Sequence, residues 1–266
     1  MIHHHWELWL IGWGAAALLL GALYLVQRRT RDATAVDAGW AVSIVLIALL
    51  CAVLGPGDIS HRLLIVVIAG LENLRIALLV GRRIGAEEDT RYQELRRRWR
   101  AQGREQSTFA IFYQAQALVA ATLSLPFVLV VFNPHRGLAP LEWVGATLWL
   151  LAATLEYVAD AQLRHFKANP ENRGKTMRFG LWRYSRHPNY FFQTLTWLAY
   201  GLVAAAAPWG WLGFASYVFI LNLVLFVTGV KPAEEQALRS RGDDFRRYQS
   251  ETSAFVPWFP RSSTGS

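Results

Sequence analysis

Apolar residues along this chain gather in long runs that polar and charged segments separate. Each run has about twenty residues, the length that a helix needs to cross a hydrocarbon core of roughly 30 Å. A run of this length must be helical in lipid, because lipid cannot form hydrogen bonds with free backbone groups. The pattern therefore predicts seven transmembrane helices, at residues 7–26, 37–55, 63–81, 109–132, 141–161, 189–207 and 209–230.

These runs predict an all-α polytopic membrane protein that forms a single integral membrane domain over residues 1–266. It consists of a three-helix part at 1–81, a cytoplasmic loop at 82–108, and a four-helix part at 109–266 that ends in a cytoplasmic tail. The composition agrees, because a soluble domain would rarely be 53% hydrophobic with 12 tryptophans. The first run lacks a basic leader and a small-residue cleavage site, so we expect it to be retained.

The basic residues predict the orientation in the membrane. Of the 27 lysines and arginines, 24 lie in the segments that follow the first, third, fifth and seventh runs. By the positive-inside rule these segments face the cytoplasm, which places the N-terminus outside and the C-terminus inside. The net charge of +8 is then mainly a signal of topology. We therefore expect membrane lipids as partners and no nucleic acid.

Cysteine and histidine give no pattern of a metal site. Cys51 is the one cysteine of the chain, so neither an internal disulfide nor a thiolate metal site can form. The seven histidines are scattered and show no His-x-x-x-His spacing. We expect no bound metal.

Two charged residues interrupt the run at 63–81. Glu72 and Arg75 are three residues apart and so share one helical face. Each costs roughly 2.5–3.5 kcal/mol at the centre of a membrane helix, so their presence calls for a reason. The pair either locks the bundle by mutual neutralisation or forms a polar floor for a substrate or cofactor.

The loop at 82–108 reads as a charged helix that begins with acidic residues and continues with arginines. Such a helix suits anionic headgroups at the membrane surface. Arg91 and Tyr92 are the members that could instead point into a site. Glu72, Arg75 and Tyr92 are therefore the predicted catalytic residues.

A polar series leaves the membrane at the end of the run at 141–161. Glu156, Asp160 and Arg164 recur every four residues, and Lys167 follows one turn later. Carboxylates accept hydrogen bonds from hydroxyl or amide groups, and the cations suit phosphate. The alternative is a solvated helix end.

The stretch "GLWRYSRHPNYFFQT" at 180–194 begins basic and aromatic and then becomes apolar. Pro188 predicts a helix start, whose free N–H groups and positive dipole end form an anion site. Positive charge crowded at that end is unfavourable unless an anion binds. The predicted binding residues around it are the cationic Arg178, Arg183, Arg186 and His187, the amide Asn189, and the aromatic Trp182, Tyr184 and Tyr190, with Tyr248 from the C-terminal segment. Topology alone and an interfacial aromatic belt are the alternatives.

Four stretches of the chain are similar to a known family: "GAEEDTRY" at 85–92, "ADAQLRHF" at 159–166, "GLWRYSRHPNYF" at 180–191 and "YQSETSAFVPWF" at 248–259. They resemble bacterial membrane proteins of the steroid 5-alpha-reductase-like family. The resemblance implies a seven-helix enzyme of the inner membrane that binds NADPH between its C-terminal spans. Such an enzyme passes hydride to a carbon–carbon double bond conjugated to a ketone in an apolar or lipid-like substrate from the bilayer.

The resemblance also implies roles for individual residues. Arg164, Lys167 and Arg178 would bind phosphates, Asp160 and Asn189 would bind the nicotinamide or ribose, and Tyr184 would line the same NADPH site. Where the steroid reductases have a span-three tyrosine this chain has Glu72, and Gln193 stands where they have a glutamate. They also have a span-two glutamate, and none occurs in the run at 37–55. The resemblance therefore supports binding of the cofactor more strongly than it supports steroid reduction. The hypothesis for the proton donor is a protonated Glu72.

Two alternatives stay open. "RHPNY" at 186–190 and "EE" at 234–235 also resemble membrane methyltransferases that act on isoprenylcysteine carboxylates or phospholipid amines with S-adenosylmethionine. The missing glutamate and tyrosine further allow a non-catalytic lipid-binding or scaffold protein.

Overall fold

The computed structural model describes residues 2, 4–82, 84–85 and 87–261, and this part of the chain is helical and contains no strand. The α-helices are α1 (His5–Thr30), α2 (Ala35–Leu54), α3 (Ile59–Gly81), α4 (Thr90–Ala101), α5 (Glu105–Leu123), α6 (Leu125–Val130), α7 (Pro140–Ala168), α8 (Pro188–Ala204), α9 (Phe214–Asn222), α10 (Val230–Arg241) and α11 (Asp243–Glu251). Short 3-10 turns are η1 (Pro170–Asn172), η2 (Gly180–Arg183) and η3 (Gly210–Gly213), and η4 (Leu223–Val227) is a π-helix. The all-α prediction is confirmed, and each predicted run overlaps helical structure.

Within the described residues, five helices are long and apolar enough to cross a membrane. They cover His5–Thr30, Ala35–Leu54, Ile59–Gly81, Pro140–Ala168 and Gly210–Arg241, and they indicate a multi-pass integral membrane protein. The other two predicted spans fall outside this set for physical reasons. Helix α8 has 17 residues, which reach only about 25 Å, and α5 carries three glutamines at 106, 114 and 116. The full count of seven spans stays a prediction.

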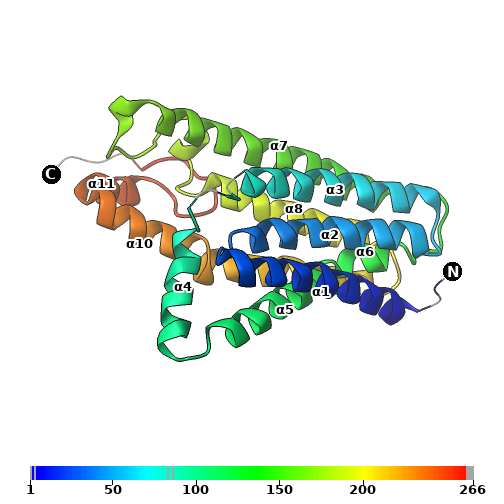
Figure 1. Cartoon of the computed structure of the whole chain (residues 1–266). Coiled ribbons are helices and arrows are strands. Elements are labelled where there is room, and N and C mark those ends of the chain that lie inside the picture. The colour runs from blue at the N-terminus through cyan, green and yellow to red at the C-terminus, as the bar shows by residue number, and fades with distance from the viewer. Residues whose placement is uncertain (1, 3, 83, 86, 262–266) are drawn as a thin grey trace. The chain divides into compact units, whose positions relative to one another are not determined.

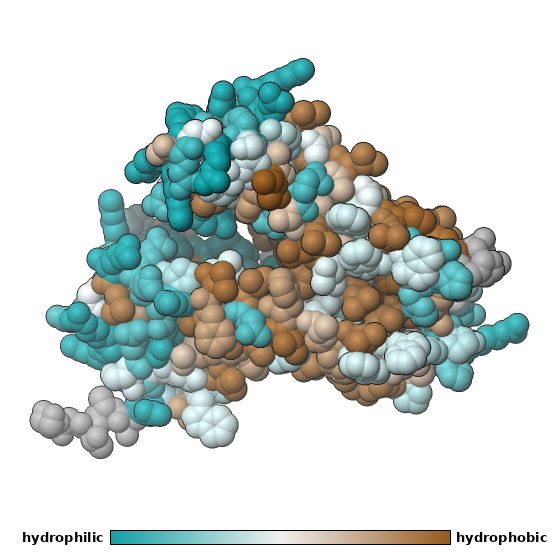
Figure 2. Space-filling view, turned by 90° about the horizontal axis from the view of Figure 1, so that it is seen from below, coloured by the Kyte–Doolittle hydropathy of each residue, from teal (hydrophilic) through white to brown (hydrophobic). Residues whose placement is uncertain are grey.

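The surface shows the same membrane character. Large apolar side chains lie exposed on several of these helices, among them Leu18 at 79%, Val53 at 74% and Leu71 at 60%. Figure 2 shows apolar residues gathered in broad brown areas of the surface, apart from the teal hydrophilic ones. Soluble monomers rarely expose apolar surface on this scale, whereas lipid tails cover it at no cost.

The chain divides into two compact units. Unit 1 comprises Met1–Trp143 and Leu202–Ser216, and unit 2 comprises Val144–Gly201 and Tyr217–Ser266. The predicted parts at 1–81, 82–108 and 109–266 follow the order of the chain, whereas these units reflect contacts. Helices α7, α8 and α9 therefore contribute residues to both.

In unit 1, α1, α2 and α3 lie side by side, and α5 packs against α1 and α2 (Figure 1). Fully buried aliphatic and aromatic side chains fill the space between them, including Leu20, Ile44, Ile65 and Phe109. The end of α2 needs a glycine, because a Cβ on Gly55 would lie 2.6 Å from the side chain of a neighbouring valine.

A buried polar contact joins the first turn of α3 to the first turn of α7 within unit 1. His61 Nδ1 lies 2.7 Å from Glu142 Oε1, and His61 Nε2 lies 3.0 Å from the carbonyl oxygen of His135. Both the His61 and Glu142 side chains are fully buried. Since both ring nitrogens face acceptors, both donate only when the ring carries two protons.

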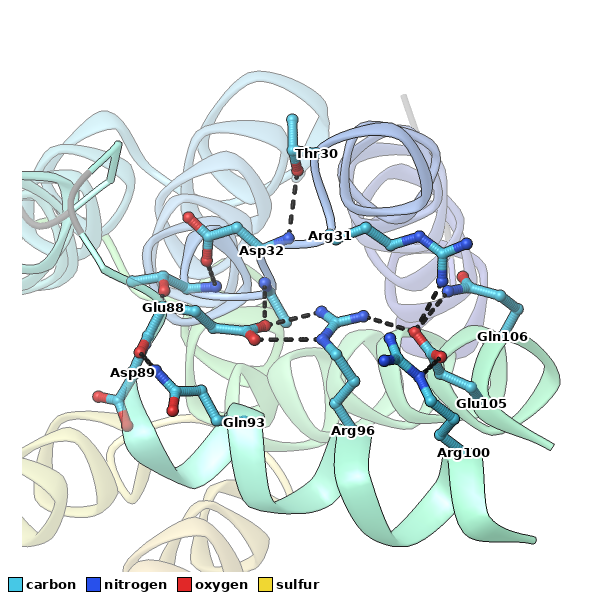
Figure 3. A network of polar contacts seen from close by, with 12 residues as sticks. Thr30, Arg31, Asp32, Glu88, Asp89, Gln93, Arg96, Arg100, Glu105 and Gln106 are labelled. Carbon is cyan, nitrogen blue, oxygen red and sulfur yellow. Dashed lines mark hydrogen bonds and ion pairs between the residues drawn. The ribbon is translucent and has the colours of Figure 1, made fainter. Parts of the chain in front are cut away.

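Helix α4 is the charged helix that the sequence predicts within 82–108. Asp89 begins it by accepting a hydrogen bond from the Arg91 backbone N–H at 3.0 Å, as N-cap residues do. Arg96 then bridges two carboxylates, Glu88 at 2.7 Å and Glu105 at 2.8 Å (Figure 3). Glu88 also accepts from the Ala33 backbone N–H at 2.8 Å. The network thus ties α4 to the α1–α2 connection and to the start of α5.

Glu105 is the centre of this network. Its carboxylate also pairs with Arg100 and Arg31, each at 2.8 Å (Figure 3). Hydrogen bonds from Arg100, together with those from Arg96 and Arg31, hold the pKa of the Glu105 carboxyl at about 2 against the opposing effect of burial.

Candidate functional site

Unit 2 builds its site where α7 meets the start of α8. Helix α8 begins at Pro188, as the sequence predicts, and places Asn189 in its first turn. The Asn189 side-chain amide donates to Asp160 Oδ1 of α7 at 3.0 Å. The other end of the amide, Asn189 Oδ1, is buried and has no hydrogen-bond partner among the described residues. The amide is therefore oriented by the protein and keeps one acceptor available.

The turn before α8 is docked on α7 by hydrogen bonds. Trp182 Nε1 donates to the Ala159 carbonyl at 2.9 Å, and the Leu181 backbone N–H donates to Gln162 Oε1 at 3.0 Å. Gly180 has φ +58°, and a Cβ there would lie 2.5 Å from Gln162, so this close approach needs a glycine. These contacts fix the wall of a cavity.

The first cavity has a volume of about 390 Å³ and lies wholly within unit 2. It brings together seven predicted cofactor-binding residues from α7, the turn at 180–187, α8 and α11: Lys167, Trp182, Arg186, His187, Asn189, Tyr190 and Tyr248. Helix α10 supplies the facing wall with small or polar side chains and with Arg241. The volume of the cavity lies within the range of small-molecule sites.

A second cavity of about 680 Å³ continues from the first, because the two share Leu163, Lys167, Met177, Ser240 and Arg241. Arg173 and Lys175 line the second cavity. Within the described part of the chain, Lys167, Arg173 and Lys175 form no salt bridge. The two cavities thus share part of their wall and are called the joined cavities below. Four cationic side chains line them: Lys167, Arg173, Lys175 and Arg241.

Sequence reasoning missed Arg173, Lys175 and Arg241 as candidate ligand-binding residues. The signal for the first two was the turn "NRGKT" in a long polar segment, where Gly174 has φ +79°. Arg241 gave no signal in the sequence, because only the fold brings it to the cavity. Its guanidinium stacks over the Phe245 ring at 5.1 Å.

Glu234, which sequence reasoning left out of the cofactor site, gathers several site residues. Arg186 Nε donates to Glu234 Oε1 at 2.6 Å, and His187 Nε2 lies 3.3 Å from the same oxygen. Gln249 donates to the second oxygen at 2.9 Å. The His187 ring stacks on Tyr190 with centroids 5.5 Å apart and planes 2° from parallel. The two stretches "RHPNY" and "EE" are therefore in contact.

Arg178 finds partners within the protein. It pairs with Asp244 at 2.8 Å and with Glu251 at 3.4 Å, and it lies over the Tyr248 ring at 5.6 Å. Burial opposes ionisation of Asp244, but hydrogen bonds from Thr176 and the charge of Arg178 lower its pKa overall. Arg178 is thus held as part of the framework of the site, as Arg186 is by Glu234.

Tyr248 keeps its proton. Its hydroxyl donates to the Trp182 carbonyl and lies 3.2 Å from the Ser185 carbonyl. Burial raises the pKa of this phenol above its ordinary value. The predicted site residue therefore holds the turn at 180–187 in place from α11.

Six predicted binding residues lie outside both cavities: Glu156, Asp160, Arg164, Arg178, Arg183 and Tyr184. Glu156 is buried on α7, and Arg164 lies over the Tyr157 ring at 5.7 Å. Arg183 is exposed, and Tyr184 is 38% exposed with its ring edge against Phe259. Asp160 accepts a hydrogen bond from Asn189, which lines the first cavity. Among the described residues, no group of three or more His, Cys, Asp or Glu side chains could hold a metal ion.

The predicted catalytic residues belong to unit 1. Arg75 donates to Glu72 at 3.0 Å, and the Glu72 side chain is almost fully buried. The Tyr92 hydroxyl donates to Asp37 at 2.5 Å, and Arg91 pairs with the same carboxylate at 2.9 Å. Burial and the Asp37 charge raise the pKa of Tyr92. The first pair lies within α3, whereas the second contact joins α4 to α2. The catalytic roles stay predictions.

The fold and the joined cavities define a helical membrane protein with two adjoining cavities in its second unit. Residues 23–252 match the model of the family DUF1295, described as a protein of unknown function, and the chain belongs to this family. An uncharacterized protein of Schizosaccharomyces pombe is 27% identical over 149 residues, which cover 49% of this chain and 43% of the relative. The chain thus spans less than half the length of that relative. No solved structure matches this chain.

Proposed function

We propose that this protein is an NADPH-dependent membrane reductase. Its substrate would be an apolar or lipid-like molecule with a ketone conjugated to a carbon–carbon double bond, which enters from the bilayer. Membership of DUF1295, a family that includes steroid 5-alpha-reductase-like proteins, supports this class. The observation that carries the proposal is the joining of the two cavities of unit 2 along Lys167 and Arg241.

The cationic part of the joined cavities fits phosphate groups. Lys167 and Arg241 line both cavities, and Arg173 and Lys175 extend the positive charge into the second. Guanidinium and ammonium groups form the strong, charge-assisted hydrogen bonds that phosphates favour. NADPH carries three phosphates, whereas S-adenosylmethionine carries none. The charge of this space therefore favours the dinucleotide.

The amide part of the first cavity fits the nicotinamide end. Asn189 Oδ1 is buried without a partner, and a buried acceptor in that state costs about 1–3 kcal/mol. A carboxamide N–H of the ligand would satisfy it. Asp160 accepts one N–H of the amide and so orients the amide oxygen for a ligand donor.

The chain's own residues would bind and orient the ligand. When bound, NADPH supplies the hydride for the double bond. Tyr190 and His187 offer a stacked aromatic wall, and Trp182 closes the cavity against α7 and excludes water. Glu72 stays the proposed proton donor to the substrate, with Arg75 beside its carboxyl.

The test is thermal stabilisation of the purified protein in mild detergent by four ligands: NADPH, NADH, S-adenosylmethionine and S-adenosylhomocysteine. A ligand that binds only the folded state at 100 times its Kd adds roughly 2.7 kcal/mol. We expect NADPH to raise the midpoint most, and NADH less, because it lacks one phosphate. Stabilisation by S-adenosylhomocysteine without any response to NADPH would contradict the proposal.

A second candidate is a membrane methyltransferase that uses S-adenosylmethionine on a lipid carboxylate or amine. The contact of His187 with Glu234 favours it, because it joins the two stretches that this chain shares with such enzymes. The same four-ligand experiment separates it from the reductase. A chain that responds to none of the four ligands is instead a non-catalytic lipid-binding or scaffold protein.

We further propose seven spans in a bacterial inner membrane, with the N-terminus outside and the C-terminus in the cytoplasm. Basic residues concentrated in alternate segments support this topology. In a Cys51→Ser background, we expect Arg136→Cys to react with an impermeant maleimide in intact spheroplasts. Arg247→Cys should react only after permeabilisation, and the reverse pattern would invert the topology.

A further inference from the structure

Residues 252–261 form a looped strap along the turn that precedes α8, and the Arg261 backbone N–H closes it by donating to the Glu251 carbonyl at 2.9 Å. The Arg186 backbone N–H donates to the Ser253 carbonyl, and the Trp258 backbone N–H donates to the Tyr184 carbonyl, both at 2.9 Å. Ser185 Oγ adds a hydrogen bond to the Phe255 carbonyl at 2.7 Å. The strap is therefore held in one register by the backbone of residues 184–186.

One face of the strap is aromatic and exposed. Phe255 packs edge-on against Phe191 with centroids 5.6 Å apart, and so anchors the strap inward. Trp258 and Phe259 are 70% and 76% exposed, and the Phe259 ring meets the partly exposed Tyr184 at 6.3 Å. Rings of this kind sit at the boundary between lipid tails and headgroups.

A third cavity, of about 400 Å³, lies beside this aromatic face and is lined by Arg178, Phe179, Gly180, Arg183, Tyr248, Glu251, Thr252, Pro260 and Arg261. The cation Arg178 is neutralised there by Asp244 and Glu251. Arg183 and Arg261 are exposed, and neither forms a salt bridge with any described residue. The cavity thus holds two cations with no protein counterion next to exposed aromatic rings.

We propose that this cavity and the aromatic face of the strap bind an anionic phospholipid. Its headgroup phosphate would lie between Arg183 and Arg261, and its acyl chain would run over Trp258 and Phe259. The site is separate from the joined cavities of the cofactor proposal, although Tyr248 lines both. A soluble anion would use the arginines but would leave the exposed rings in water, so the combination of charge and rings favours a lipid.

The experiment measures lipid retention by native mass spectrometry and the thermal midpoint of the full chain in detergent. The probes are phosphatidylglycerol, phosphatidylcholine and glycerol 3-phosphate. We expect phosphatidylglycerol to be retained and to raise the midpoint, and the other two to do neither. The double variant Arg183→Gln with Arg261→Gln should lose at least tenfold in phosphatidylglycerol affinity, as should Trp258→Ser with Phe259→Ser.

Two controls keep the outcome decisive. Arg239→Gln removes an exposed arginine of α10 that lines none of the three cavities, and it should bind phosphatidylglycerol as the wild type does. Arg183→Lys with Arg261→Lys keeps both charges and should retain most of the affinity, which also decides the case if the glutamine variant does not fold. Unchanged phosphatidylglycerol retention in the glutamine variant, or equal stabilisation by glycerol 3-phosphate, would overturn the proposal. Neither result depends on whether NADPH binds.

Discussion

Asn189 and Asp160 are joined by one hydrogen bond of 3.0 Å that links the first turn of α8 to α7 within unit 2. The bond uses the donor end of the Asn189 amide and leaves its buried oxygen without a hydrogen-bond partner among the described residues. Asn189 thereby adds a polar group to the wall of the first cavity, and Asp160 sets the orientation of the Asn189 amide.

Asn189→Ala should lower NADPH affinity at least tenfold, because it removes both the acceptor oxygen and the amide donor to Asp160. Asp160→Ala should weaken NADPH less, since the amide stays but loses its fixed orientation. Isothermal titration in detergent measures both. Asn222→Ala is the matched control, because the Asn222 side chain donates to Val218 of its own helix and lines neither cavity. Wild-type NADPH affinity in both site variants would show that the nicotinamide does not lie here.

Lys167→Ala and Arg241→Ala should each weaken NADPH by roughly ten- to hundredfold, since a hydrogen bond to a charged group is worth about 1.5–3 kcal/mol. The dependence of affinity on salt concentration should become shallower in both variants, because part of the electrostatic attraction is lost. Arg239→Ala removes an exposed arginine of α10 that lines neither cavity, and it should change neither quantity. An unchanged salt dependence in the site variants would exclude these two cations from phosphate binding.

Replacing His61 by Leu should destabilise unit 1 by about 3–5 kcal/mol, because it leaves the buried Glu142 carboxylate without its partner. Glu142→Gln should cost a comparable amount. The double variant His61→Leu with Glu142→Leu should be much less destabilised than the sum, since it leaves no uncompensated charge. Chemical unfolding in mixed micelles measures the three midpoints. Additive effects would show that the two side chains do not interact.

The Glu105 network should weaken in acid. The folded-state pKa of Glu105 is about 2 and its ordinary value is 4.5. The stabilisation is therefore complete above pH 4.5 and is lost as the pH falls from 4.5 toward 2. The difference in thermal midpoint between the wild type and Glu105→Gln should be largest at neutral pH and shrink over this window. A difference that stays constant from pH 7 to pH 3 would contradict the role of the ionised carboxylate.

Gly229→Ala should disturb the position of α10. A Cβ at residue 229 would collide with the Val224 carbonyl oxygen, inside the π-helix η4 that leads into α10. Because α10 forms one wall of the first cavity, the variant should lose NADPH stabilisation as well as thermal stability. Gly70→Ala on α3 has open space for its Cβ and should be neutral. Equal behaviour of the two variants would mean that η4 adapts without moving α10.

The helices were predictable because their signals are local. Runs of apolar residues located the long helices, and Pro188 located the start of α8. The charged helix at Thr90–Ala101 followed from the acidic start and basic end of its segment. The interruption of the last long helix by η4 was not predicted, because residues 223–227 are uniformly apolar and carry no sign of an extra residue in the turn.

The partners of the cations could not be predicted from local sequence. Arg178 and Arg186 look alike in the chain as positive charges near a helix start. Their counterions Asp244 and Glu234 come from α11 and α10, and only the fold brings them there. In the same way Arg241 reaches the cavity from a helix end that the sequence presents as an ordinary surface segment. Charge could be located along the chain, but which charges remain without a protein partner depends on tertiary contacts.

The strap at 252–261 also bears on how the protein is made. Residues 184–186 and the strap are hydrogen-bonded to each other, yet the strap is synthesised after all the helices from α8 to α11. Until it emerges, the Arg186 and Trp182 side of the first cavity lacks both the strap and the Tyr248 hydroxyl that hold it. Insertion of the long helices into the membrane and completion of the first cavity should therefore be two separable events in biosynthesis.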